Sequence, residues 1–469
     1  MDQFPLVFPF RTDDRRYVYD LGTNDFFTVD QEIWDNFVQR EISVLTRKDI
    51  SAVLADGIFT VQQAEQFILP SYAALQNKLE HDLGSLILCV SEKCNMRCSY
   101  CTYGGNYTYT RTHSDRTMSL DVARRALDYY LPRAPKPTLG FFGGEPLLVP
   151  AFMEKILEYA LKKVDSIDVN LTTNGTLLRG AVVDWLACNK VNLLVSIDGI
   201  QETHDRNRRL RSGTPTFSLI LDNLRKAAAD HPEWFKKSVR VHMVATPPYD
   251  LRPYEELILN NRDLFEDSLA ISLSFVNTQD TDAVECSPSI EANKTKEIER
   301  MRTQYFHAHV QENRSKLTVE SSLFDTEMFK IHRRKIFDTG NGIIPLNGAC
   351  LPALRRIYVD VDGRLHICER INGSMPVGSV YDGVSARLIH NIIENYAHIS
   401  SKACRNCWAA RYCPLCYVHA ADNECFDIKK KETRCEAIRK SICDSFILYN
   451  SIMERNPEAF AYMHEFFML

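Results

Sequence analysis

Six short apolar runs alternate with amphipathic stretches between residues 86 and 277. The apolar runs cover residues 86–90, 139–142, 169–172, 193–197, 239–244 and 269–275. Between them, helical spacing of apolar residues predicts helices at 120–131, 151–163, 180–188, 217–229 and 254–260. Strands joined by helical crossovers pair in parallel, so the pattern predicts an α/β protein with a parallel sheet. The sheet is either doubly wound and open or curved into a partial barrel, and in both cases functional loops follow the carboxyl ends of the strands.

The first eighty residues show a different pattern. Residues 17–19 and 26–29 are β-prone runs separated by the turn-forming residues 22–25, which predicts a hairpin. Asp30 is placed to cap a helix at 31–40, and a second helix is predicted at 61–79. The start of the chain therefore reads as a small α+β module.

The last part of the chain is polar and then rich in cysteine. Residues 285–335 predict a helical connector, and the region beyond has few long periodic runs before 438–453. A region with so few apolar residues has too thin a core to fold well without metal.

Charge and composition exclude several classes of partner. The 469 residues include 56 basic and 61 acidic side chains, a formal net charge of -5 that offers no basic surplus for a phosphate backbone or an anionic membrane. Apolar runs are far shorter than the roughly 20 residues of a membrane span. The first five residues lack the basic and apolar regions of a secretory signal, so we expect a cytoplasmic protein with neither nucleic acid nor membrane as partner.

Fifteen cysteines are unusual in a protein expected to stay in a reducing compartment, and they indicate metal binding or catalysis. Cys94, Cys98 and Cys101 form a CxxxCxxC loop directly after the first predicted strand. Three thiolates can hold three irons of a cubane cluster and leave the fourth iron open to a ligand. The alternative is a zinc loop, although structural zinc sites prefer four ligands in CxxC pairs.

A second cysteine group lies near the C-terminus. It consists of Cys350, Cys368, Cys404, Cys407, Cys413, Cys416 and Cys435, with Cys425 as a rival to Cys435. Zinc is a stronger alternative here, because CxxC-x5-CxxC is also a plausible zinc knuckle. The isolated Cys89, Cys188, Cys286 and Cys443 are expected to be small buried apolar residues.

The first motif resembles the radical S-adenosylmethionine (SAM) superfamily, whose CxxxCxΦC signature has an aromatic residue, here Tyr100, before the last cysteine. The resemblance extends to three strand ends: a GGEP motif at residues 143–146, a TTNG stretch at 172–175 and an SxDG stretch at 196–199. It implies a partial (β/α)6 barrel, with SAM bound at the open iron. The cofactor contacts that it implies are Tyr100, Gly143, Gly144, Glu145, Asn174, Ser196 and Asp198. The basic segment 206–211 would meet the cofactor, a substrate or only solvent.

The C-terminal cysteines resemble the SPASM domain of radical enzymes that modify peptides. The resemblance implies two auxiliary 4Fe-4S clusters, three clusters in all. One would be held by Cys404, Cys407, Cys413 and Cys435, and the other by Cys350, Cys368 and Cys416. Two departures are the x2 spacing between Cys413 and Cys416, where x3 is usual, and Arg356 at the place of an extra cysteine in some members. The cluster held by Cys350, Cys368 and Cys416 therefore has no obvious fourth thiolate, and an open iron there could bind a substrate thiolate.

The N-terminal module is similar to the winged-helix element with which maturases of ribosomal peptides bind a leader peptide as an added strand. Dimerisation or simple packing is the alternative role. The stretch 103–119 also looks like maturases that form thioethers in cysteine-rich peptides. The expected domains are thus 1–82 for leader recognition, 83–284 for the radical SAM barrel, 285–345 for the connector and 346–469 for the SPASM domain.

Together these resemblances imply a peptide-modifying oxidoreductase. A 5'-deoxyadenosyl radical would take hydrogen from a ribosomally made precursor peptide, and a thioether would then join a cysteine sulfur to carbon. The reductant would be a flavodoxin- or ferredoxin-like protein. The alternatives are carbon–carbon (cyclophane-type) cross-linking, formylglycine formation in a sulfatase, and a metal-binding peptide scaffold without catalysis.

Overall fold

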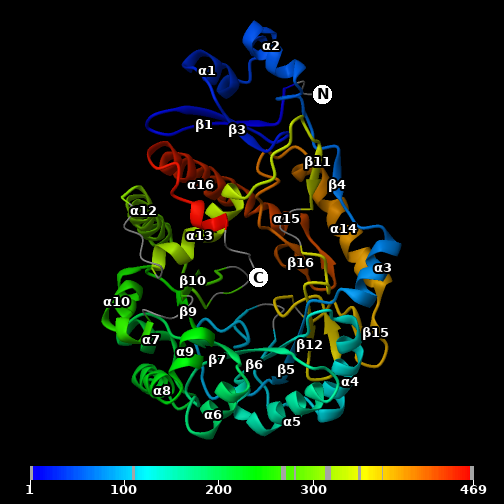
Figure 1. The fold of residues 1–469 in the computed structure, drawn as a ribbon, viewed down its shortest axis with the longest axis vertical. Helices are drawn as coiled ribbons and strands as arrows, with labels where there is room; N and C mark the ends of the chain where they lie inside the picture. Colours follow the sequence, from blue (N-terminus) through cyan, green and yellow to red (C-terminus); the bar gives the residue numbers. More distant parts are fainter. Residues whose placement is uncertain are drawn as a thin grey trace.

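The computed structural model describes residues 4–107, 111–265, 271–278, 281, 283–311, 318–346, 350–371 and 373–464. Its centre is a sheet with the order β10-β9-β8-β7-β6-β5 followed by β12-β13-β14-β15 (Figure 1). The first six strands are β5 (Ser85–Ser91), β6 (Thr138–Gly143), β7 (Asp168–Thr173), β8 (Asn192–Ser196), β9 (Val239–Ala245) and β10 (Ile271–Phe275). All six predicted strands are confirmed, and residues 269 and 270 of the last one lie outside the described residues.

The strand order decides between the two architectures left open by the sequence. β5 to β10 pair in parallel and in chain order, whereas a doubly wound sheet reverses its order part-way. Right-handed crossovers in one direction place the helices on one side of the sheet, as in a barrel wall. In the described residues β10 does not pair with β5, so the barrel is partial.

The crossover helices also follow the prediction. They are α4 (Leu120–Tyr130), α5 (Pro150–Leu161), α6 (Ala181–Cys188), α8 (Phe217–Asp230) and α10 (Arg252–Asn260). Short elements between them are η2 (Leu131–Arg133), η3 (Pro146–Leu148), α7 (Gln201–Asn207), α9 (Pro232–Ser238) and α11 (Arg262–Phe265). On β9 the buried residues alternate with half-buried ones, so one face of the strand packs on helices while the other faces the barrel interior.

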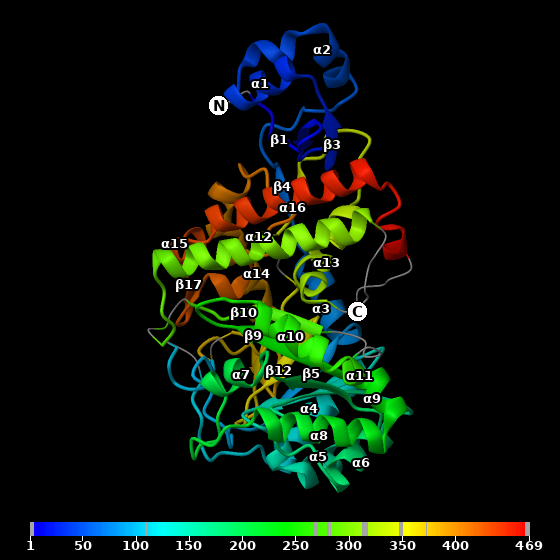
Figure 2. The same ribbon diagram turned by 90° about the vertical axis from the view of Figure 1, so that its left-hand side faces the viewer.

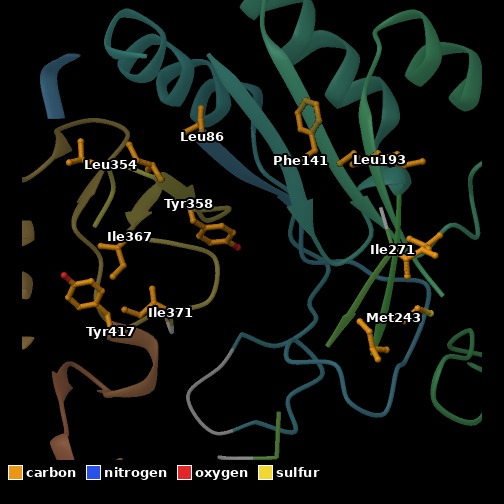
Figure 3. Packing of buried hydrophobic residues seen from close by; sticks show 14 of the residues in the cluster. Leu86, Phe141, Leu193, Met243, Ile271, Leu354, Tyr358, Ile367, Ile371 and Tyr417 are labelled. Atoms are coloured by element: carbon orange, nitrogen blue, oxygen red, sulfur yellow. The ribbon is translucent and has the colours of Figure 1, made fainter. Parts of the chain in front are cut away.

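The C-terminal region continues the barrel sheet, which the sequence did not indicate. β12 (Arg356–Val359) pairs in parallel with β5, and β13 (Arg364–His366), β14 (Gly378–Ser379) and β15 (Gly383–Val384) follow in antiparallel order. Figure 3 shows the resulting continuity of the core, from Leu86 and Phe141 in the barrel to Tyr358 and Tyr417 beyond it. The barrel and the cysteine-rich region therefore share one hydrophobic core.

The N-terminal module is a three-stranded antiparallel sheet with helices on one face. β1 (Val7–Arg11) precedes the predicted hairpin, which is confirmed as β2 (Arg16–Asp20) and β3 (Asp25–Thr28). α1 (Gln31–Gln39) is capped by the Asp30 side chain as expected, and η1 (Ile42–Thr46) and α2 (Lys48–Ala55) follow. These helices close a small separate core around Phe37 and Phe59.

The opposite face of this sheet packs on the C-terminal region. Phe8 stacks on Trp408 with ring centroids 3.7 Å apart, and Tyr19 and Phe26 contact Phe446 with centroids 4.9 Å apart. Phe446 lies on α16 (Cys435–Arg455), which crosses below the module in Figure 2.

The predicted helix at 61–79 is wrong. The segment forms β4 (Gln66–Ile68) and then α3 (Tyr72–His81), because Pro70 cannot continue a helix and Ser71 caps the new one through its side chain. β4 pairs in parallel with β11 (Ile343–Pro345), a partner far along the chain.

The connector is helical, as predicted, with α12 (Pro288–Val310) and α13 (Val319–His332). The sequence analysis missed one long helix before 438, α14 (Ala386–Cys404), which precedes α16. Its apolar residues Ile389, Ile392, Ile393 and Tyr396 have helical spacing and are buried or nearly so. The remaining elements are η4 (Tyr417–His419), β16 (Ala421–Asp422), β17 (Cys425–Phe426), α15 (Ile428–Glu432) and η5 (Ala461–His464). Within the described residues, every helix is too short or too polar to cross a bilayer.

Candidate functional site

The three-cysteine loop leaves the carboxyl end of β5 and folds against the segment after α7. The backbone N–H of Arg97 donates to Arg209 O at 2.9 Å, and Ser99 N–H donates to Asn207 O at 3.0 Å. These bonds fix the loop from outside and leave the thiols of Cys94, Cys98 and Cys101 half-buried.

Burial dominates the chemistry of these thiols. It raises the pKa of Cys94 to about 12 and that of Cys101 to about 11, and negative charge on one thiol raises the pKa of the others further. Thiols in this setting remain protonated unless a cation compensates the thiolate charge, which is what an iron centre provides.

In the described part of the chain, no group of three or more His, Cys, Asp or Glu side chains has the arrangement of a bound metal ion. That the three half-buried thiols hold three irons of a cluster stays a prediction.

The GGEP turn follows β6 and lies against the start of the cysteine loop. A Cβ on Gly144 would lie 2.1 Å from Lys93 O, and one on Gly143 would lie 2.2 Å from Ser91 O. Gly143 also has a φ of +135°, which favours glycine. The two glycines therefore let the GGEP backbone touch the residues that precede Cys94.

Glu145 is fully buried and joins the ends of two strands. Its carboxylate accepts hydrogen bonds from Leu147 N at 3.0 Å, Thr173 Oγ1 at 2.6 Å and Asn174 N at 2.7 Å. Burial raises its pKa, although these donors oppose the shift. Its predicted contact with SAM stays a prediction, and its observed contacts hold the TTNG stretch beside GGEP.

Asn174 connects the TTNG stretch to the cysteine loop. Its Nδ2 donates to Asn95 Oδ1 at 2.8 Å, and it lies 4.0 Å from the Sγ of Cys94. Asn95 Nδ2 in turn donates to Thr176 Oγ1 at 2.8 Å. The structure thus brings Asn174 to the first cysteine.

Tyr100, Asp198 and Arg208 form a buried polar group beside Cys98. The Tyr100 hydroxyl donates to Asp198 Oδ2 and accepts from Arg208 Nη1 at 2.9 Å. Asp198 Oδ1 accepts from Val244 N at 2.9 Å. Burial raises the pKa of Cys98, whereas the Arg208 guanidinium lowers it.

Arg208 is the member of the basic segment that belongs to the site. It is buried, whereas Arg206, Arg209 and Arg211 are exposed. Its Nε is a buried N–H for which the described residues supply no acceptor. A buried, incompletely paired guanidinium beside the thiols fits an anionic group such as a carboxylate. The remaining predicted contact, Ser196, is the half-buried last residue of β8 and pairs in register with His242.

Several of the C-terminal cysteines interact with other members of their predicted ligand set. Negative charge on Cys416 raises the pKa values of Cys350 and Cys368, after the larger effect of burial. Burial likewise raises the pKa values of Cys407 and Cys435, and the neighbouring Cys404 and Cys413 raise them further. Cys425, by contrast, is exposed on β17. That these cysteines bind auxiliary iron–sulfur clusters stays a prediction.

The expected burial of the isolated cysteines holds only in part. Cys89 is buried and Cys443 is half-buried, but Cys188 and Cys286 are exposed. Cys188 ends α6, and Cys286 directly precedes the N-cap of α12, so neither occupies a position that faces a core.

Sequence reasoning missed Arg111, which ties the two cysteine regions together. Its guanidinium donates to Glu369 O at 3.0 Å and to Ile371 O at 3.2 Å, and it lies 4.0 Å above the Tyr358 ring. These carbonyls flank the loop after Cys368. The stretch 103–119 contains Arg111, but residues 108–110 lie outside the described residues, and no local pattern marks a contact more than 250 residues away.

A family model matches the segment that contains the three-cysteine loop. Residues 88–264 match the model of the Radical SAM superfamily. The chain carries a radical SAM domain. This domain contains the CxxxCxxC loop, GGEP, TTNG and SxDG stretches described above.

Two curated relatives match parts of this chain. The serine-type anaerobic sulfatase-maturating enzyme of Bacteroides thetaiotaomicron is 30% identical over 34% of this chain and 40% of its own length. The cysteine-type anaerobic sulfatase-maturating enzyme of Clostridium perfringens is 33% identical over 29% of this chain and 39% of its own length. The chain therefore spans about 40% of the length of these relatives.

The fold extends beyond the radical SAM domain. The solved structure of anSMEcpe with bound AdoMet has a TM-score of 0.57 at 18% identity and covers 82% of this chain and 99% of that one. At this identity the likeness concerns the fold alone, and at 82% of the chain it extends over more than residues 88–264.

Proposed function

We propose that this protein modifies a ribosomally made precursor peptide and forms a thioether between a cysteine sulfur and a carbon. The observation that carries the proposal is the presence of seven further cysteines, one buried and six half-buried, in the region that continues the sheet and core of the radical SAM barrel. A scaffold without chemistry would need neither these cysteines nor the GGEP turn pressed against Cys94.

The residues present fit the implied cofactors. Cys94, Cys98 and Cys101 would hold the first 4Fe-4S cluster, and the GGEP backbone, Asn174, Ser196 and Asp198 would surround SAM. When bound, the cluster and SAM supply a 5'-deoxyadenosyl radical that abstracts a hydrogen atom from a peptide carbon. Arg208 would bind the SAM carboxylate, because it is a buried cation with an N–H that still requires an acceptor.

The chain's own residues hold the site in place. Glu145 links the ends of β6 and β7, and Asp198 links β8 to β9, so the strand ends that surround the cofactor are connected by buried carboxylates. These groups have little freedom to reorganise, and such rigidity favours the near-attack geometry that hydrogen abstraction from an unactivated carbon needs.

The C-terminal cysteines would hold two auxiliary 4Fe-4S clusters. The set Cys350, Cys368 and Cys416 offers three thiols, so a substrate cysteine can complete it. Joining that sulfur to the carbon would remove two protons and two electrons from the peptide in total: one of each leaves as the abstracted hydrogen atom, and the thiol proton and one surplus electron leave separately. The auxiliary clusters would take the surplus electron, and a flavodoxin- or ferredoxin-like protein would supply the first one.

The N-terminal module would bind the leader of the precursor. β1 and β3 are edge strands, each paired with β2 alone in the described residues, and an extended peptide can add to such an edge. The packing of the module on Trp408 and Phe446 would place the leader close to the C-terminal cysteines.

The test is anaerobic reconstitution followed by incubation with SAM, a reductant and cysteine-rich peptides encoded beside the gene. We expect about twelve irons per chain, for three cubanes, SAM cleavage, and a peptide that has lost a pair of hydrogens and one alkylatable thiol. Zinc in place of iron would refute the enzyme.

The mass and the reactivity of the product distinguish thioether formation from the alternative reactions. A carbon–carbon cross-link also removes a pair of hydrogens but leaves every thiol alkylatable. Formylglycine, the product suggested by the sulfatase-maturating relatives, reacts with hydrazides. Either result would keep the radical enzyme and replace the thioether. A Cys98→Ala variant that still modifies the peptide would refute radical chemistry altogether.

A further inference from the structure

A buried lysine lies against the second group of C-terminal cysteines. Lys431 belongs to α15 and is 1% exposed. Its Nζ donates to Ser400 Oγ at 2.8 Å and to Cys404 Sγ at 3.6 Å, both on α14. It also lies 4.4 Å from the centroid of the Tyr396 ring. The ammonium group is thus enclosed by a hydroxyl, an aromatic face and a thiol.

A buried cation is costly unless an anion accompanies it. No carboxylate of the described residues forms an ion pair with Lys431, and its neighbour Ser400 is neutral. Of the groups that enclose the Lys431 ammonium, the Cys404 sulfur accepts a hydrogen bond from it and can carry a negative charge. The position of Lys431 therefore suits a negatively charged sulfur at Cys404.

We propose that Lys431 is a positioning residue that compensates the charge of the cluster held by Cys404, Cys407, Cys413 and Cys435 and sets its reduction potential. The inference rests on the proposed function, because it requires that cluster. A fixed cation and an N–H···S hydrogen bond both stabilise the more negative, reduced state. Lys431 thereby raises the midpoint potential of this one cluster and makes it the better electron acceptor.

Three variants separate charge from shape. Lys431→Met removes the charge and keeps a long apolar side chain, whereas Lys431→Arg keeps the charge. The matched control is Lys430→Met, because Lys430 is the adjacent lysine and pairs with Asp422 at 3.9 Å. Each protein is reconstituted without oxygen, its iron is counted, and its clusters are titrated with a reductant while the electron paramagnetic resonance signals are recorded.

We expect one auxiliary cluster of Lys431→Met to titrate at a more negative potential than in the parent protein. The other two clusters of Lys431→Met should titrate as in the parent protein. All three clusters of Lys431→Arg and of Lys430→Met should do the same. If Lys431→Met loses one cluster's iron while Lys431→Arg keeps it, the charge requirement is also supported.

Two results overturn the inference and are distinguishable from failure of the proposed function. A Lys431→Met protein with full iron and unchanged potentials refutes the role of the charge, and loss of iron in both Lys431 variants shows that only the shape matters. If the parent protein itself holds iron for the first cluster alone, the auxiliary clusters of the proposed function fail, and the role of Lys431 fails with them.

Discussion

Substitution of Gly144 by alanine tests whether the GGEP turn positions the first cysteine. A Cβ at this position would lie 2.1 Å from Lys93 O and 2.6 Å from Lys93 C. Both atoms are backbone, so no side chain can rotate away. Because Lys93 directly precedes Cys94, any relief of this clash displaces the cluster loop.

The size of the effect follows from the contacts. Relief of the clash requires a backbone shift of about 1 Å, and overpacking of this kind costs about 1–3 kcal/mol. The shift also strains the hydrogen bonds from Gly144 N to Ser91 O at 2.7 Å and from Glu145 N to Lys93 O at 2.8 Å. Each such bond contributes about 1 kcal/mol. We expect the free energy of unfolding to fall by about 3 kcal/mol in total.

The assay compares Gly144→Ala with Gly373→Ala, where the added Cβ meets no atom within 4 Å. After reconstitution, Gly144→Ala should lose the iron of one cluster and most SAM cleavage but keep the C-terminal iron. Gly373→Ala should retain both properties. A Gly144→Ala protein with full iron and the parent rate of SAM cleavage would show that the turn does not position Cys94.

Three further predictions concern other parts of the molecule. Cys435→Ser should lose the iron of one auxiliary cluster, whereas Cys425→Ser should keep all of its iron, as measured by iron content. The reverse result would make Cys425, not Cys435, the last cluster ligand. Arg111→Met should lower the free energy of unfolding by about 3 kcal/mol and lower product yield more than SAM cleavage. The control Arg333→Met also removes donors to two backbone carbonyls and should leave the ratio of product yield to SAM cleavage unchanged. Equal ratios in both variants would show that Arg111 does not connect the two cysteine regions. His204 is a buried residue of α7, and burial and the Arg208 guanidinium lower its pKa to about 2. Its neutral form therefore stabilises the fold above the ordinary pKa of about 6.5, and this stability is lost as the pH falls. Between pH 7 and pH 5 the free energy of unfolding of the parent, measured with denaturant, should fall by about 2 kcal/mol more than that of His204→Asn; equal decreases would show that the pKa of His204 is not lowered.

The barrel was predictable because its signals are local. A strand covered on both faces reads as an apolar run, and a glycine-rich or polar strand end reads as a turn, so all six strands and five crossover helices were recovered. The helix break at Pro70 also had a local signal, and α14 had regular apolar spacing that the surrounding cysteines obscured.

Long-range pairing was not predictable from the sequence. β12 joins β5 across about 270 residues, and neither strand carries a mark of its partner. The same holds for buried charges: Arg208 and its exposed neighbours are indistinguishable in the sequence, and Lys431 lies in a run of three lysines. Which member of such a segment turns inward depends on the packing of elements far away in the chain.

The pairing of β12 with β5 also fixes the distance between the first cysteine loop and the cysteine-rich region. Strands in one ladder are held about 4.8 Å apart by hydrogen bonds, so the loop that leaves β5 with the first three cysteines and the segments around β12 cannot swing like two domains on a hinge. Any electron that passes between these regions meets a gap of nearly constant length. Under the proposed function, accommodation of different peptides would be left to the loops and the N-terminal module, while the spacing on which electron transfer would depend is built into the sheet.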